Sequence, residues 1–153
     1  MDSKELIWTD EELNIIYENV DNYILSCGTS KPDYSKLFAL IDRLKGQKGV
    51  NVKFLCVDVA NGYMRNFCET VKEVRKKYPE LVLVGGNVVT KELVEELVLN
   101  GGLDIVKIGI GSGSVCTTRL KCGCGRPQLS AVLECADAAH GLDSHIISDG
   151  GIQ

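Results

Sequence analysis

Short apolar runs alternate with amphipathic stretches along most of the chain. The apolar runs are rich in β-branched residues and predict five strands, at Tyr23–Ser26, Val52–Val57, Leu81–Val84, Asp104–Ile110 and His145–Ser148. Apolar residues at helical spacing predict helices at Tyr34–Lys45, Tyr63–Tyr78, Lys91–Leu99 and Leu129–His140. The first twenty residues have a weaker pattern, helical or irregular. Strand–helix alternation of this kind predicts a parallel sheet covered by helices.

Four of the predicted strands end in glycine or polar clusters. These clusters are Asp58–Gly62, Gly85–Asn87, Gly109–Gly113 and Asp149–Gly151. Because α/β folds place their sites at the carboxyl ends of parallel strands, we expect the functional residues here.

Two architectures fit this pattern, a doubly wound sheet and a (β/α)8 barrel, and periodicity does not distinguish them. A complete barrel has eight strands and typically about 250 residues. If the fold is a barrel, residues 1–153 form one incomplete barrel domain that lacks strands at both ends.

The composition argues against several classes of protein. The chain has 44% hydrophobic residues and a net charge of −4, with no basic cluster, which gives no electrostatic case for nucleic acid or an anionic membrane. No run approaches the ~18 apolar residues of a membrane span. The polar N-terminus does not suit a signal peptide, so the expected compartment is the cytoplasm. Seven cysteines, an odd number, argue against a disulfide framework; Cys56 and Cys135 lie in apolar runs, as small buried hydrophobes do.

The most informative segment is the loop Gly109–Arg119. Its three glycines allow close approach of the backbone to a ligand, and they precede the thiol of Cys116, hydroxyl side chains and Arg119. A thiol near a cation and free N–H groups can become nucleophilic. The alternative is that Cys116 is a small buried residue in a tight turn. The spacing does not fit a dinucleotide-binding glycine fingerprint, and Cys116, Cys122 and Cys124 do not have a standard zinc spacing.

Two acidic positions are ambiguous on local grounds. Asp58 and Asp149 each follow a predicted strand and precede glycine. Each carboxylate could accept hydrogen bonds from a ribose, or could simply stabilise a turn. Gly150 and Gly151 could bring backbone donors to a phosphate.

Taken together, the motifs resemble the IMP dehydrogenase/GMP reductase family. The resemblance rests on six segments in order, Asp58–Tyr63, Gly86–Thr90, Gly109–Arg119, Pro127–Val132, Glu134–Leu142 and Ser148–Gly151. Most of them, including Asp-Val-Ala-Asn-Gly-Tyr at 58–63, are similar to the reductase branch. Cys124–Gln128 and Asp149–Gln153 are similar to the dehydrogenase branch, which stays open as the alternative.

The resemblance implies a (β/α)8 barrel, of which this chain is about strands three to seven. For the reductase branch it implies NADPH-dependent conversion of GMP to IMP and ammonia, with Cys116 attacking the purine C2 carbon. By position it implies a catalytic role for Thr118. Three sets of contacts follow in the same way: the cofactor at Asp58, Val59, Ala60, Ile110 and Gly111; the nucleotide at Ser114, Asp149, Gly150 and Gly151; and a potassium ion at Gly111, Gly113, Cys116 and Arg119. The resemblance also implies a homotetramer for the full-length protein.

This sequence also departs from the family pattern. Ser112 replaces a proline, which is expected to loosen the loop, Gly101–Leu103 contains one extra residue, and Arg126 replaces a tyrosine. The resemblance also implies missing strands and a missing flap, which carries the partner of the catalytic threonine. We therefore expect the isolated chain to be inactive and poorly soluble. A non-catalytic chain that associates with full-length subunits stays open as a third hypothesis.

Overall fold

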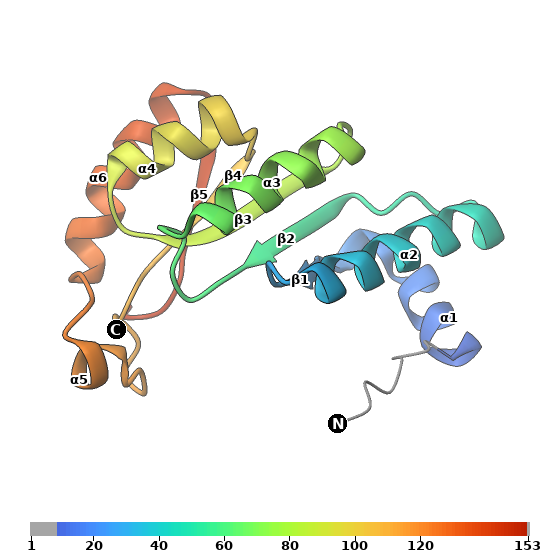
Figure 1. The fold of residues 1–153 in the computed structure, drawn as a ribbon, viewed down its shortest axis with the longest axis horizontal. Coiled ribbons are helices and arrows are strands. Elements are labelled where there is room, and N and C mark those ends of the chain that lie inside the picture. Colours follow the sequence, from blue (N-terminus) through green and yellow to red (C-terminus); the bar gives the residue numbers. More distant parts are fainter. Residues whose placement is uncertain (1–8, 153) are drawn as a thin grey trace.

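A computed structural model of the chain describes residues 9–152, and its centre is a sheet of five parallel strands (Figure 1). The strands are β1 (Leu25–Cys27), β2 (Phe54–Asp58), β3 (Val82–Val88), β4 (Ile105–Ile108) and β5 (His145–Ser148). Their order in space is their order in the chain. A doubly wound sheet reverses its order at a switch point, so this sheet is instead part of a (β/α)8 barrel, as one of the two predictions had it.

Helices lie before β1 and between successive strands, and the longer ones form a layer against the sheet. They are α1 (Asp10–Glu18), α2 (Lys31–Lys48), α3 (Arg65–Lys77), α4 (Lys91–Glu96), α5 (Thr118–Cys122) and α6 (Gln128–Gly141), with short helical turns η1 (Val20–Asn22) and η2 (Leu97–Gly101). Right-handed crossovers between consecutive parallel strands place their helices on one face. Accordingly α4 packs on α6, and α6 packs on β4 and β5. No helix in residues 9–152 is long and apolar enough to cross a bilayer.

The core lies between the sheet and this layer. Phe67, Val71 and Val74 from α3 are buried there with strand residues such as Leu55 and Val106. At roughly 1.5–3 kcal/mol for each fully buried large aliphatic or aromatic side chain, this apolar contact holds the helices against the strands. The carboxyl edge of the sheet is thereby fixed as a platform for the loops.

Helix boundaries follow local capping chemistry. Helix α2 begins at Lys31, three residues before the predicted start, because the Ser30 side chain accepts a hydrogen bond from the Asp33 N–H and a proline occupies the first turn. It ends at Gly49, whose φ of 64° terminates the helix. Thr90 precedes α4 as predicted, but its hydroxyl accepts from Tyr63 Oη at 2.9 Å instead of capping the helix.

Two strands differ most in length from the prediction. Strand β3 continues through Gly85, Gly86 and Asn87, predicted as a loop, because both of its neighbours pair with it at the two glycines. Only glycine fits at Gly86, where a Cβ would lie 2.5 Å from the Lys107 carbonyl oxygen. Strand β4 stops at Ile108 rather than Ile110 because the chain turns at Gly109, with a φ of 146°.

The extra residue near Gly101 is absorbed in a π-helical turn. Helix α4 continues into η2, whose wider winding takes up more residues over the same rise than an α-helix does. Gly102, with a φ of 79°, then ends the turn, and its carbonyl accepts a 2.8 Å hydrogen bond from Arg75 Nε. Strand β4 consequently begins in register with β3.

Candidate active site

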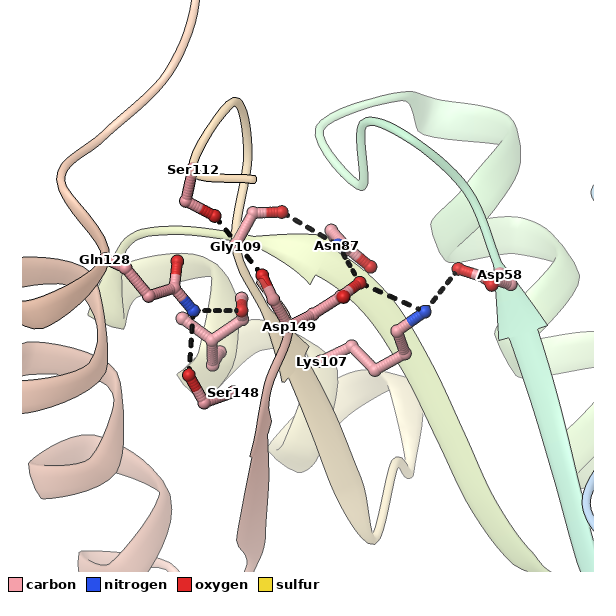
Figure 2. Close-up of polar contacts among 9 residues, drawn as sticks. Asp58, Asn87, Lys107, Gly109, Ser112, Gln128, Ser148 and Asp149 are labelled. Atoms are coloured by element: carbon pink, nitrogen blue, oxygen red, sulfur yellow. Dashed lines mark hydrogen bonds and ion pairs between the residues drawn. The ribbon is translucent and has the colours of Figure 1, made fainter. Parts of the chain in front are cut away.

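The polar residues predicted as a site lie along the carboxyl edge of β2 to β5. Asp58 is the last residue of β2, the glycine loop begins directly after β4, and Asp149 follows β5. Figure 2 shows side chains from these neighbouring strands turned toward one another. The structure therefore brings together residues that are up to 91 positions apart in the sequence.

At the centre of this edge is Lys107, which the sequence analysis did not select. Its Nζ lies 2.8 Å from Asp58 Oδ1 and 3.4 Å from Asp149 Oδ2 (Figure 2). Asn87 Nδ2 donates to the same Asp149 Oδ2 at 2.8 Å and to the Gly109 carbonyl at 2.8 Å. We call Lys107, Asp58, Asp149 and Asn87 the Lys107 cluster.

The alternation of β4 explains where Lys107 points. Its neighbours Val106 and Ile108 are fully buried in the core beneath the helices. Successive side chains of a strand point to opposite faces, so Lys107 lies on the face away from the helix layer. Its side chain is only 16% exposed, which means that the ammonium depends on the two carboxylates for compensation.

Charges in the cluster stabilise one another. Burial disfavours the charged form of Lys107, but the hydrogen bond and charge of Asp58 and the charge of Asp149 outweigh this and raise the lysine pKa above its usual value. The hydrogen bond from Asn87, followed by the charge of Lys107, holds the pKa of Asp149 below its usual value. Lys107 and Asp149 are therefore both held in their charged forms at neutral pH.

The loops after β4 and β5 are in direct contact. Ser112 Oγ donates to the Asp149 carbonyl at 3.2 Å, so the serine that was expected to loosen the loop ties it to its neighbour. Gly150 and Gly151 have φ values of 74° and 71°, and a Cβ on Gly151 would lie 2.8 Å from the Ser112 carbonyl oxygen. Below them, Gln128 Nε2 donates to the Ile108 carbonyl and to Ser148 Oγ, joining the ends of β4 and β5.

Cys116 lies at the far end of the glycine loop and is half-buried. Its N–H donates to the Gly113 carbonyl at 3.0 Å, and its Sγ is 3.2 Å from Thr118 Oγ1, the first residue of α5. Arg119, the next residue of α5, donates from Nε to the Gly111 carbonyl at 2.6 Å. Cys116, Thr118 and Arg119 are therefore held in one compact turn.

This turn lowers the pKa of the Cys116 thiol. Hydrogen bonds from the Thr118 hydroxyl and backbone are the main cause, with smaller contributions from the Gly111 backbone and the charge of Arg119. Burial has the opposite effect elsewhere, and raises the pKa of Cys27 to about 12 and those of Cys56 and Cys135 to about 11. The Cys116 thiol therefore ionises more readily than those of Cys56 and Cys135, which are buried as predicted.

Comparison with known proteins shows which family the chain belongs to. A family model described as "IMP dehydrogenase / GMP reductase domain" matches residues 27–153. The chain belongs to the IMP dehydrogenase/GMP reductase family. It is 55% identical to GMP reductase 2 of Bos taurus over 132 residues, which cover 86% of this chain and 36% of the relative. It is 54% identical to GMP reductase of Caenorhabditis elegans over 134 residues, covering 88% of this chain and 36% of the relative. The chain thus spans about a third of the length of these curated relatives.

The predicted family residues fall into two neighbouring groups in the structure. Asp58, Val59 and Ala60 continue from β2, where the Val59 N–H and carbonyl both pair with β3 backbone at 2.8 Å. Asp149 and its two glycines continue from β5. Ile110 and the turn of Cys116, Thr118 and Arg119 follow β4, between these groups, and Ser114 is exposed on the same loop.

The predicted potassium ligands do not form a cation cage. The carbonyls of Gly111 and Gly113 already accept hydrogen bonds from Arg119 and Cys116. The guanidinium of Arg119 also places a positive charge at the Gly111 oxygen, which a potassium ion would have to approach. This arrangement does not fit the ion. Among residues 9–152, no three His, Cys, Asp or Glu side chains are placed to hold a metal.

Surface hollows lie at the opposite edge of the sheet. One of about 790 Å³ is lined by residues such as Asp42, Lys45 and Tyr78 beside the starts of β2 and β3. Another of about 620 Å³ is lined by residues such as Arg75 and Ser144 beside the starts of β4 and β5. In (β/α)8 enzymes the amino edge serves stability and the carboxyl edge serves chemistry, so the Lys107 cluster remains the candidate site.

Arg126, where the family usually has tyrosine, joins three segments of the chain. It donates to the Val89 carbonyl at 2.7 Å and to Glu134 Oε2 at 2.5 Å. Glu134 Oε1 in turn accepts from the first N–H of α4, that of Lys91, at 3.1 Å. The hydrogen bond from Arg126, followed by that from Lys91, lowers the pKa of Glu134 to about 2.

We expect this glutamate to contribute to stability in a pH-dependent way. Since its pKa is lower in the folded chain, the contribution is complete above the ordinary value of 4.5 and is lost as the pH falls toward 2. Melting temperatures of wild type and Glu134→Gln should differ at pH 7 and converge below pH 4.5. Glu95→Gln, an exposed glutamate on α4, serves as the control and should not follow this pattern. A constant difference across the range would contradict the prediction.

Proposed function

We propose that this chain forms the catalytic-cysteine part of a GMP reductase. The observation that carries the proposal is the Cys116 turn, in which Thr118 and Arg119 lower the pKa of a half-buried thiol at the edge that also carries Asp58 and Asp149. The names of its relatives support this substrate. The finer expectations, a cytoplasmic homotetramer using NADPH, belong to the same proposal.

The reaction would be GMP + NADPH + 2H⁺ → IMP + NADP⁺ + NH₄⁺. The Cys116 thiolate attacks the purine C2 carbon, forming a C–S bond, and the 2-amino group leaves as ammonia. NADPH, when bound, supplies the hydride that C2 then receives. The C–S bond breaks, the electron pair returns to sulfur, and IMP is released. Covalent attachment divides a difficult substitution into easier steps.

The chain's other residues bind and orient the two ligands in this proposal. Thr118 is in contact with the sulfur and helps protonate the leaving amine. Asp58, Val59 and Ala60, with Ile110 and Gly111, form the cofactor side. Ser114, Asp149, Gly150 and Gly151 form the nucleotide side, where left-handed glycines leave N–H groups available to a phosphate.

A graft tests the proposal directly. Residues 27–153 replace the matching segment of GMP reductase 2 of Bos taurus, so that the relative supplies the remainder of the barrel. The grafted enzyme should consume NADPH at 340 nm with GMP and release one ammonia per NADPH. A grafted enzyme that has the parent's oligomeric state and melting behaviour but no such activity would refute the proposal.

IMP dehydrogenase activity is the second candidate, favoured by the residues Cys124–Gln128 and by Ile152 after the Asp149 loop. It uses the same cysteine, but hydride leaves the adduct and water then releases XMP. Grafting the segment into an IMP dehydrogenase gives the comparison. NAD⁺ reduction with IMP in that graft, without NADPH loss in the reductase graft, would favour the dehydrogenase.

A further inference from the structure

We propose that Lys107 is a positioning residue shared by the two ligands, and that through it the nucleotide and the cofactor bind cooperatively. The proposal rests on the proposed function, because it takes Asp149 as a nucleotide contact and Asp58 as a cofactor contact. Lys107 itself touches neither ligand in this account. It acts through the two carboxylates on either side of it.

Lys107 contacts the two carboxylates at different distances. The ammonium is 2.8 Å from Asp58 Oδ1, a hydrogen-bond distance, and 3.4 Å from Asp149 Oδ2, a looser ion pair. In residues 9–152 these contacts and the Asn87 bond involve one oxygen of each carboxylate. The second oxygen of each, Asp58 Oδ2 and Asp149 Oδ1, is left to accept a hydrogen bond from a ligand.

The ammonium of Lys107 cannot interact equally strongly with both carboxylates. A ribose hydroxyl that donates to Asp149 partly neutralises that carboxylate and reduces its attraction for Lys107. The ammonium then interacts more strongly with Asp58. This interaction fixes the orientation of the Asp58 carboxylate before the cofactor binds. The same reasoning applies in reverse, as thermodynamic linkage requires, so each ligand raises the affinity for the other by one factor.

The surroundings of Lys107 make its charge costly. A charged side chain on an otherwise apolar strand, Ile105–Ile108, costs desolvation that a neutral residue would avoid. Sheet pairing alone does not require it, since the backbone of β4 already pairs with β3 and β5. The titratable groups beside it are Asp58, Asp149 and the buried Cys56 thiol, whose pKa of about 11 keeps it neutral near pH 7.

Equilibrium binding in the grafted enzyme measures the coupling. NADP⁺ and IMP form a pair that does not turn over as a reductase, and calorimetry gives the affinity for each with and without the other. We expect at least fivefold mutual enhancement, the lower end of typical allosteric coupling. Lys107→Met should reduce this enhancement to about onefold, while Lys107→Arg, which keeps the charge, should retain most of it. Undiminished coupling in Lys107→Met would overturn the proposal.

A second measurement on the 153-residue chain needs no enzymatic activity. Carboxyl titration by NMR should show the pKa of Asp149 rising in Lys107→Met but not in Lys107→Arg. If the methionine variant does not fold, Lys107→Gln replaces it. An unchanged Asp149 pKa in a folded variant would refute the contact on which the coupling depends. An altered pKa in a chain whose graft is inactive would instead refute the proposed function and leave the contact intact.

Discussion

Replacing Cys116 by serine in the grafted enzyme is expected to lower kcat by at least about 10³-fold, because no other group takes over the bond to C2. A serine hydroxyl at this position keeps the size and the contact with Thr118. It does not ionise near neutral pH, so the same turn that lowers the cysteine pKa leaves serine protonated. Nucleotide affinity should change little, since the Asp149 side of the site is untouched. The measurement is the initial rate of NADPH oxidation at saturating GMP.

Cys122→Ser is the matched control for this experiment. Cys122 is exposed on the same turn, and its Sγ donates to the Thr118 carbonyl at 3.1 Å, a contact that serine preserves. The control should retain activity within a few-fold. Activity of Cys116→Ser within tenfold of the parent, or a loss in Cys122→Ser as large as that in Cys116→Ser, would contradict the assignment of the nucleophile.

Replacing Gly109 by alanine is expected to destabilise the chain by about 3 kcal/mol or more, since backbone strain and a steric clash add at one position. Gly109 has a φ of 146°, and its Cβ would lie 2.3 Å from the Asp149 carbonyl oxygen. That carbonyl belongs to the backbone, so it cannot simply rotate away. The loops after β4 and β5 would separate, and the Ser112–Asp149 hydrogen bond would be lost with them.

Gly46→Ala provides the comparison for this glycine. Gly46 lies on the exposed side of α2, with no atom within 4 Å of its would-be Cβ, and alanine is a better helix former by about 1 kcal/mol. Urea unfolding of the two variants should therefore shift in opposite directions. A Gly109→Ala variant as stable as wild type would show that the two loops separate without cost.

Most of the fold was predictable because its signals are local. The five apolar runs became five strands, with His145–Ser148 exact, because a parallel strand that packs against helices needs apolar residues. Errors arose where pairing decided the outcome. Gly85 and Gly86 are typical of loops, yet they lie in β3 because β2 and β4 both pair with them. The short helix α5 was missed because five residues carry too little periodicity to detect.

The site was predictable only in part, for a related reason. Cys116, Asp58 and Asp149 follow strands in glycine-rich segments, and that pattern is visible along the chain. Lys107 is inside a strand, where a single charge between apolar residues was the only signal. Its role depends on two carboxylates 49 and 42 residues away, which only the sheet brings within reach.

The π-helical turn at Leu97–Gly101 has a consequence for how this protein can vary. It takes up an additional residue at the amino edge of the sheet, while Lys107 and the glycine loop lie at the carboxyl edge, at the other end of β4, which begins paired with β3 at Ile105. A change of length in this turn therefore falls on the side of the sheet opposite the candidate site. We expect the fold to tolerate the gain or loss of a residue there, whereas the same change between Ile108 and Cys116 would displace the Cys116 thiol.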